Sequence, residues 1–115
     1  MKIAQLSRDD GTVVCERCVV ADRPLRRMRG LLGRRTLPSD EGIWLKPAGS
    51  IHMFFMRFAI DCLFLDQSMS VVAVKTVKPW RTAAAKGAKS VVELAEGEAE
   101  RRGVRLGDRL RLTVT

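Results

Sequence analysis

The chain has no tyrosine, a single histidine and only three cysteines among its 115 residues. Proteins that stack bases or sugars on their surface usually present several aromatic side chains. With no tyrosine and only two tryptophans, the chain has few aromatic side chains for such a stacking surface. We therefore interpret Trp44 and Trp80 as core or rim residues. Any nucleic-acid binding would have to depend on charge.

The few cysteines do not favour a metal site. Cys15 and Cys18 have the Cys-x-x-Cys spacing that occurs in zinc and thiol redox sites. In a regular extended strand, however, residues three apart point to opposite faces, and no glycine bends the chain between these two. The remaining soft ligands, His52 and Cys62, lie far along the chain. We therefore expect structural cysteines, no bound metal and no cofactor.

The sequence also lacks an apolar run of the roughly 20 residues that a membrane-spanning helix needs. Its most apolar stretch is interrupted by His52, Arg57 and Asp61. The first ten residues become charged before an apolar signal core could form. We therefore expect a cytoplasmic protein with no membrane span. No repeat or linker divides the chain, so residues 1–115 are expected to form one domain whose site would be a surface cleft.

Charge of one sign predominates. Lysine and arginine number 21 against 13 aspartates and glutamates, which gives a net charge of +8. This excess would attract nucleic acid, anionic lipid or acidic ligands. Most of the cations are arginine, whose planar guanidinium suits carboxylates and phosphates, although a GC-rich genome would also enrich arginine. No nucleic-acid recognition motif accompanies the charge, so charge alone does not select a partner.

Short alternating segments separated by turn residues predict a mainly β fold. Asp9-Asp10-Gly11 predicts a tight turn between strands at 2–6 and 12–21. One helix is predicted at about 23–33, because apolar residues recur there at helical spacing and a glycine ends the pattern. The remaining predicted elements are strands at 43–45, 50–55, 60–65, 71–77, 90–94 and 109–114, a loop at 81–89 and a helical turn at 96–103. This spacing favours a single-domain antiparallel sandwich or open barrel with the short α-helix packed on it.

The segment from Ser50 to Asp66 combines the densest apolar run with several polar side chains. If its start is extended, Ser50 and His52 share a face, and a carboxylate such as Asp61 or Glu93 could orient the histidine for hydrolase-type catalysis. The spacing does not enforce this arrangement, and no nucleophile elbow surrounds the serine. A structural histidine is the favoured interpretation.

Asp61 makes the firmer physical demand, because a buried carboxylate needs an arginine or backbone N–H donors. Arg29, Arg34 and Arg57 are the candidate partners. Such a pair would be either a structural latch between helix and sheet or one wall of an anion-binding cleft. The predicted ligand-binding residues are Arg29, Arg34, Ser50, His52, Arg57 and Asp61.

Three groups of residues occur in a characteristic order. They are Arg29 to Arg34 followed by Asp40-Glu41-Gly42, the segment Ile60 to Asp66, and Val92-Glu93-Leu94 followed by Gly107-Asp108. In these groups the chain resembles the domain of unknown function 192 (DUF192) family over about residues 20–112. The resemblance implies a mostly β, jelly-roll-like sandwich with the arginine helix packed on it and no established activity.

The sequence departs from the family pattern at a few positions. Leu32 stands where the family has methionine, which is close to a volume-neutral change. The turn after Asp66 has Gln67-Ser68-Met69 where relatives often have glycine, so a tight two-residue hairpin is not expected there. Many relatives carry export signals that this sequence does not show, and the pair at Cys15 and Cys18 matches no family pattern.

The function we predict is the binding of a small polar or anionic ligand, or of an acidic protein partner, at a cleft between helix and sheet. A hydrolase that uses Ser50 and His52 with an acidic residue is the enzymatic alternative. Non-specific nucleic-acid binding is the third hypothesis, and it rests on the net charge and the arginine-rich helix.

Overall fold

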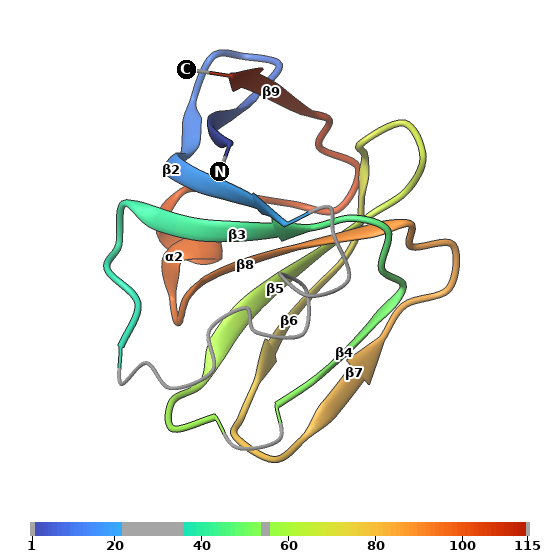
Figure 1. Cartoon of the computed structure of the whole chain (residues 1–115). Helices are drawn as coiled ribbons and strands as arrows, with labels where there is room; N and C mark the ends of the chain where they lie inside the picture. Colours follow the sequence, from blue (N-terminus) through green and yellow to red (C-terminus); the bar gives the residue numbers. More distant parts are fainter. Residues whose placement is uncertain (1, 22–35, 54–55, 115) are drawn as a thin grey trace.

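The computed structural model of the protein describes residues 2–21, 36–53 and 56–114 (Figure 1). The helix predicted at 23–33, together with Arg29 and Arg34, lies outside these described residues. Strands account for most of the regular structure, which confirms the mainly β class predicted from the sequence. The one helix in the described ranges is short and lies near the C-terminal end of the chain, where the sequence predicts a helical turn.

Nine strands and one helix make up the described regular structure. Their bounds are β1 Ile3–Arg8, β2 Val13–Ala21, β3 Glu41–Leu45, β4 Ser50–His52, β5 Ile60–Leu65, β6 Val71–Val77, β7 Thr82–Ala84, β8 Ser90–Ala95, α2 Glu98–Arg101 and β9 Leu110–Val114.

Seven of the strands form one sheet in the order β6-β5-β8-β3-β2-β1-β9, and β4 pairs with β7 in a separate two-stranded ribbon. All neighbouring strands run antiparallel except β2 and β3, which are parallel, so the large sheet is mixed. Strand β7 lies inside the segment predicted to be a loop, and that part of the prediction is wrong. β4 also ends earlier than predicted, at His52.

The first hairpin follows directly from the sequence. Gly11 takes a φ of 89°, a conformation that glycine adopts without steric cost. Its N–H donates to the carbonyl of Arg8 at 2.8 Å, and the carboxylate of Asp10 accepts from the N–H of Thr12 at 2.9 Å. The Asp-Gly turn predicted between β1 and β2 is therefore confirmed.

The seven-stranded sheet curls until its two edge strands meet at one end. An isolated bridge pairs Ser70, just before β6, with Arg109, just before β9, and the N–H of Leu110 donates to the carbonyl of Met69 at 2.9 Å. Beyond this point β6 and β9 do not continue as a ladder, so the sheet is not closed into a barrel. The curled sheet is therefore held together at one end and open at the other.

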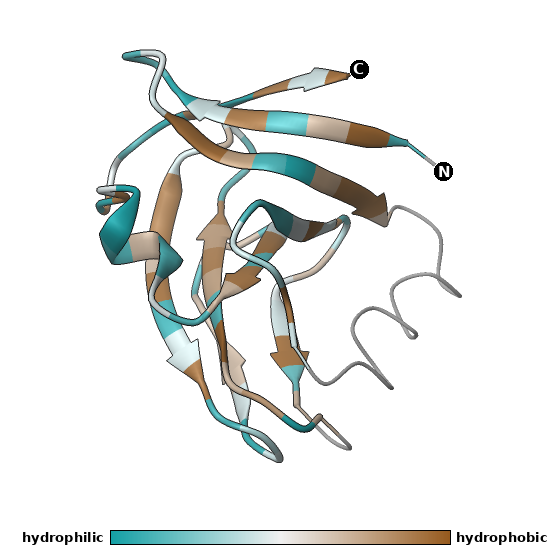
Figure 2. Ribbon diagram, turned by 90° about the vertical axis from the view of Figure 1, so that its left-hand side faces the viewer, coloured by the Kyte–Doolittle hydropathy of each residue, from teal (hydrophilic) through white to brown (hydrophobic). Residues whose placement is uncertain are grey.

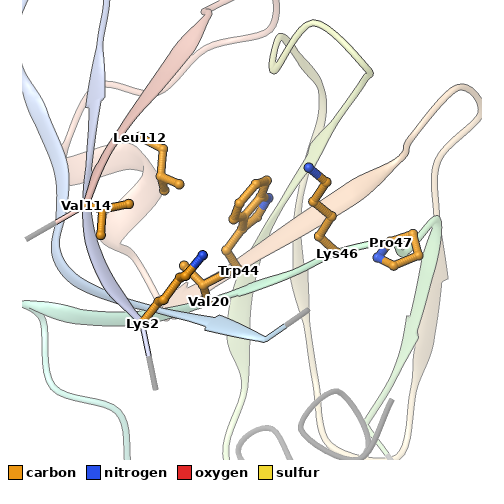
Figure 3. A pocket seen from close by; sticks show the side chains of 7 residues that line it. All are labelled: Lys2, Val20, Trp44, Lys46, Pro47, Leu112 and Val114. Atoms are coloured by element: carbon orange, nitrogen blue, oxygen red, sulfur yellow. The ribbon is translucent and has the colours of Figure 1, made fainter. Parts of the chain in front are cut away.

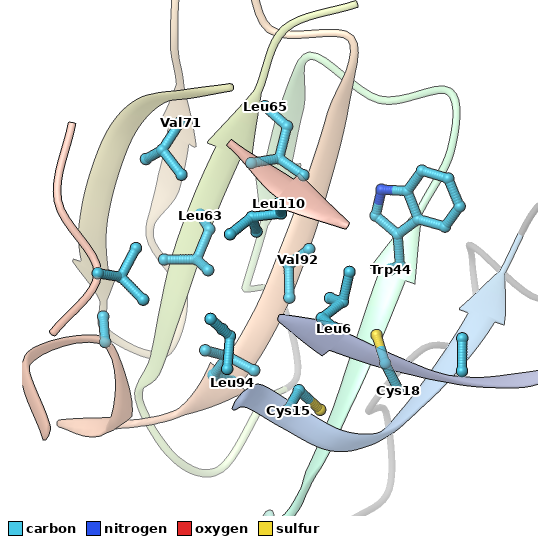
Figure 4. Packing of buried hydrophobic residues seen from close by; sticks show 14 of the residues in the cluster. Leu6, Cys15, Cys18, Trp44, Leu63, Leu65, Val71, Val92, Leu94 and Leu110 are labelled. Carbon is cyan, nitrogen blue, oxygen red and sulfur yellow. The ribbon is translucent and has the colours of Figure 1, made fainter. Parts of the chain in front are cut away.

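The two faces of the large sheet bury two separate apolar clusters. The concave cluster includes Leu63, Leu65, Trp44 and Leu110, and α2 contributes Ala99 to it (Figure 4). The second cluster, on the opposite face, includes Ile60, Phe64 and Val91 together with Ile51 of the β4–β7 ribbon. β5 is buried along its whole length because it contributes alternate residues to both clusters. In Figure 2 the strands at the centre of the sheet are largely hydrophobic, whereas α2 is largely hydrophilic.

Candidate functional site

The carboxylate of Asp61 is fully committed to internal hydrogen bonds. One oxygen, Oδ1, accepts from the hydroxyl of Thr76 at 2.8 Å. The other, Oδ2, accepts from the backbone N–H groups of Gly97 and Ala99, at 3.0 Å each. The residue is only 3% exposed. Of the two kinds of partner predicted from the sequence, the structure uses backbone N–H donors, and Asp61 fastens the α2 turn to strand β5.

Asp61 lies on the opposite face of the large sheet from the ribbon that carries Ser50 and His52. Its neighbours at alternate positions, Leu63 and Leu65, belong to the concave cluster, whereas Ile51 between Ser50 and His52 belongs to the second cluster. A strand places successive side chains on opposite faces, so Asp61 shares the concave face with Leu63 and Leu65. The structure therefore does not bring Asp61 together with the predicted serine and histidine.

Ser50 and His52 share one exposed face of β4, as their spacing predicts. They pair across the ribbon with Ala84 and Thr82, and Ile51 between them is buried. Arg57 is also exposed. Of the six residues predicted to bind a ligand, the four that the structure describes thus occupy an exposed ribbon, an exposed turn and a buried latch.

Glu93 is the second buried carboxyl group near the middle of the large sheet. It lies on β8 opposite Cys62 and opposite Ile43, and is 7% exposed. Because both of these neighbours belong to the second cluster, Glu93 is on the face that the β4–β7 ribbon covers. Burial raises the pKa of Glu93 to about 7, and burial likewise raises the pKa of the Cys62 thiol. Of the two acids considered for a hydrolase, Glu93 is the one on the ribbon's side of the sheet.

The structure contains a groove that the sequence did not indicate, at the open end of the curled sheet (Figure 3). It has a volume of about 350 Å³. Its lining comes from strands β9, β2 and β3, from the residue before β1 and from the two residues after β3. The lining residues are Lys2, Val20, Trp44, Lys46, Pro47, Leu112 and Val114.

Alternation along each strand explains why these residues meet. Lys2 is in phase with the buried residues Ala4 and Leu6, and Lys46 is in phase with Trp44, so both lysines project from the concave face. Val20 and Trp44 are directly paired between β2 and β3. The N–H of Val20 donates to the carbonyl of Lys2 at 2.9 Å, which places the start of β1 beside them.

The groove exists because β9 loses its second neighbour as it runs away from the closed end. Leu110, beside the contact with Met69, is 3% exposed, Leu112 is half-buried and Val114 is 58% exposed. These three residues share one face of the strand. The concave cluster is therefore sealed at Leu110 and opens to solvent towards Val114.

Trp44 forms the most unusual part of this groove. Its side chain is buried, with 7% of its surface exposed, and its Nε1–H is a buried donor without a hydrogen-bond partner. Buried tryptophan N–H groups usually have an acceptor, and leaving a buried donor unpaired costs about 1–3 kcal/mol. The ammonium of Lys46 lies over the indole ring, 5.2 Å from its centroid. The groove thus contains a tryptophan with an unpaired N–H donor and a lysine ammonium that lies over the face of its ring.

Sequence reasoning interpreted Trp44 as a core or rim residue, which agrees with its burial, but it missed the groove. The available signal was a tryptophan, whose N–H needs an acceptor, two residues before a lysine on the same face of a strand. That signal does not reveal which other strands lie beside it, and residues 2, 20, 44 and 112 become neighbours only through tertiary pairing.

The cysteine pair also differs from its predicted geometry. Ala4 pairs with Cys18 and Leu6 with Cys15, so two steps along β1 match three steps along β2. This β-bulge turns Cys15 and Cys18 to the same face, where both are fully buried in the concave cluster (Figure 4). The prediction that they point to opposite faces is wrong. The hydrogen bond between the two thiols, together with burial, raises the pKa of Cys18.

Within the described ranges, no group of three or more histidine, cysteine, aspartate or glutamate side chains is arranged to hold a metal ion. In the same ranges no helix is long and apolar enough to cross a membrane.

A mixed, curled seven-stranded sheet with a short helix over one cluster and a two-stranded ribbon over the other defines a small mainly β domain. The sequence matches the DUF192 family, described as an uncharacterized ACR, over residues 5–112. The chain belongs to this family.

Related sequences carry the family name UPF0127. A UPF0127 protein of Thermococcus sibiricus is 34% identical over 114 residues, which span 91% of this chain and 71% of the relative. A UPF0127 protein of Pyrococcus furiosus is 38% identical over 96 residues, which span 78% of this chain and 81% of the relative.

Two crystal structures have the same fold. A Sinorhizobium meliloti protein, provisionally described as a transcription regulator, superposes with a TM-score of 0.82 at 23% identity, over 96% of this chain and 92% of that one. A protein of unknown function from Novosphingobium aromaticivorans superposes with a TM-score of 0.80 at 22% identity, over 95% and 83% of the two chains. At this level of identity the similarity establishes the fold alone.

Proposed function

We propose that this protein binds a small, partly apolar anionic molecule in the groove beside Trp44. The observation that carries the proposal is the unpaired, buried Nε1–H of Trp44, a residue that lines a groove bordered by two lysines. Small-molecule sites are concave and mostly apolar, with a few polar groups that fix the ligand's orientation. The groove has this composition, since Val20, Leu112 and Val114 supply the apolar wall.

The volume of about 350 Å³ limits the size of the ligand. It lies near the lower end of the range of about 300–1,000 Å³ that is common for small-molecule sites. One water occupies about 30 Å³ of liquid, so the groove would hold a ligand of about a dozen non-hydrogen atoms. The proposed ligand is therefore the size of a small metabolite and much smaller than a dinucleotide.

This location differs from the cleft between helix and sheet that the sequence predicts. That earlier site, built from Arg29, Arg34 and the segment after Ser50, stays a prediction, as does the hydrolase hypothesis. The hydrolase hypothesis would now draw its acid from Glu93, because Asp61 is a latch on the opposite face. Non-specific nucleic-acid binding also stays a prediction, which rests on the net charge and on the arginine-rich helix that lies outside the described residues.

The two tryptophans provide a direct test of the proposed groove. Trp44 lines it, and Trp80 is 58% exposed on the turn before β7. A nitrogen–proton NMR spectrum contains one indole N–H peak for each, and the variant Trp80→Phe assigns them. A library of small carboxylates, phosphates, amines and neutral compounds is then added one compound at a time.

We expect acidic compounds with an apolar part to move the Trp44 peak while the Trp80 peak stays in place. The proposal is wrong if no compound in the library moves the Trp44 peak, or if the shifts gather around Ser50 and His52. Binding of duplex DNA that weakens steeply with salt would instead support the nucleic-acid hypothesis.

A further inference from the structure

We propose that the ligand of this groove is a monocarboxylate with an apolar body, and that its carboxylate accepts the Trp44 N–H while it pairs with the ammonium of Lys46. This inference rests on the function proposed above and names the chemical class of the ligand. It follows from what the groove can and cannot offer.

The polar side chains at the groove are all donors. Among the described residues that line it, the polar groups are the indole N–H of Trp44 and the ammonium groups of Lys2 and Lys46, and none is a carboxylate, hydroxyl or amide. Such a site offers hydrogen bonds to acceptors and repels cations. Amines and other cations are therefore unsuited to it. Sugars, whose hydroxyl protons need acceptors, are unsuited as well.

The donor set favours a carboxylate over a phosphate. Phosphate sites usually present arginine forks or several backbone N–H groups at a helix N-terminus. The described lining has neither, since its cations are lysines and none of its residues belongs to a helix. Two carboxylate oxygens match the indole N–H and one ammonium, whereas a phosphate dianion would bring more charge and more oxygens into an apolar groove.

The apolar wall fits the rest of the molecule. Val20, Leu112 and Val114 face the groove from β2 and β9, and the half-exposed Val114 forms its rim. Burial of an apolar tail against this wall is favourable by about 25 cal/mol per Å² removed from water. An eight-carbon acid has ten non-hydrogen atoms and fits the size derived from the volume of about 350 Å³.

Lys46 has to move when the ligand enters. The Nε1 atom of Trp44 is buried in this structure, and the ammonium of Lys46 lies 5.2 Å from the centroid of the ring. A lysine side chain has a flexible four-carbon stem, so it can leave the ring face and follow the carboxylate. Binding would then give Lys46 an ion pair with the ligand and would also give the unpaired N–H of Trp44 its acceptor.

The test uses four probes with the same eight-carbon chain, namely octanoate, octan-1-ol, octylamine and octyl phosphate, on the full chain at pH 7. Dissociation constants are measured by following the Trp44 indole peak. We expect octanoate to bind at least ten-fold more tightly than the alcohol and the phosphate, and octylamine not to bind.

Two lysine variants provide a matched pair. Lys46→Met removes the charge at the groove and keeps the length of the side chain. Lys75→Met makes the same change at a second cation–π contact, where the ammonium lies 5.7 Å from the Phe64 ring centroid, away from the groove. We expect the first to weaken octanoate binding about ten-fold, which corresponds to about 1.4 kcal/mol, and the second to leave it unchanged. Lys46→Gln replaces Lys46→Met if the latter does not fold.

The outcomes separate this inference from the function on which it rests. If octyl phosphate or octan-1-ol binds as tightly as octanoate, the carboxylate assignment is wrong but the groove is still a ligand site. If Lys46→Met and Lys75→Met bind octanoate equally well, Lys46 is not the pairing group. If neither these probes nor the broader library moves the Trp44 peak, both proposals are refuted.

Discussion

Removing the carboxylate of Asp61 should destabilise the whole domain. In Asp61→Ala, the backbone N–H groups of Gly97 and Ala99 and the hydroxyl of Thr76 lose their acceptor at the same time. These three contacts connect α2 and β6 to strand β5. The substitution therefore breaks the attachment of the C-terminal helical turn to the sheet.

The size of the effect can be worked out from the burial of each donor. The Ala99 contact is buried, and an unpaired buried N–H costs about 1–3 kcal/mol. The Gly97 and Thr76 contacts are only partly buried, so water can replace part of each bond and we assign about 1 kcal/mol to each. The total of about 3–5 kcal/mol is a large fraction of the 5–15 kcal/mol by which a typical domain is stable.

Asp61→Asn should have a smaller effect. An asparagine can direct its oxygen at the two backbone donors and its amide at Thr76, whose hydroxyl can accept instead of donate. What is lost is the charge that strengthens the bonds, so we expect about 1–2 kcal/mol.

Urea unfolding followed by circular dichroism at pH 7 measures both variants. Asp9→Ala is the matched control, because Asp9 is an exposed aspartate in the first turn, and its loss should change the free energy of unfolding by less than about 0.5 kcal/mol. If Asp61→Ala is no less stable than Asp9→Ala, the latch does not contribute to stability and the reasoning from burial fails.

Three further predictions concern the core. The pKa of Glu93 is about 7 in the folded protein and about 4.5 in the unfolded chain, so between these pH values only the folded state keeps the proton. The free energy of unfolding should therefore fall by about 3 kcal/mol as the pH rises from about 4.5 to about 7. Urea titrations at several pH values should show this pH dependence of the free energy of unfolding in the wild type but not in Glu93→Gln. The same pH dependence in both proteins would show that Glu93 is not its source. Gly42→Ala should cost about 1–3 kcal/mol in the same assay, because the new Cβ would lie 2.8 Å from the carbonyl oxygen of Glu93, and an unchanged stability would show that the strands can separate. Diamide should link Cys15 to Cys18 only slowly in the folded protein, because both thiols are fully buried and the pKa of Cys18 is raised, and faster in urea. Mass spectrometry detects the link as the loss of two hydrogens, and equal rates with and without urea would contradict the burial.

The parts of the fold that the sequence predicted well are those set by local patterns. Ile60–Leu65 and Val71–Val77 match their predicted bounds because each is an apolar, β-branched or aromatic run between turn residues. The last strand was recognised from its alternation, which the burial of Leu110 and the exposure of Arg111 confirm. Strand β7 was missed because Thr82–Ala84 is short and rich in alanine, and it becomes a strand only by pairing with β4.

The site was harder to predict because its parts depend on long-range pairing. The need of Asp61 for strong donors was evident from its apolar neighbours, but the choice of Gly97 and Ala99 depended on where α2 packs. The bulge in β2 cannot be recognised from alternation, since one extra residue reverses the faces of Cys15 and Cys18 without a local signature. A family resemblance supplied the architecture but no activity.

The incomplete closure of the curled sheet also leaves two strand edges that other chains could pair with. Away from their contact at Ser70 and Arg109, β6 and β9 are edge strands, and open edges can pair with other chains. Each edge carries an exposed cation near its middle, Lys75 on β6 and Arg111 on β9. Two copies that met edge to edge would bring like charges together, so the same open sheet that leaves room for a groove is protected against strand addition by its basic residues.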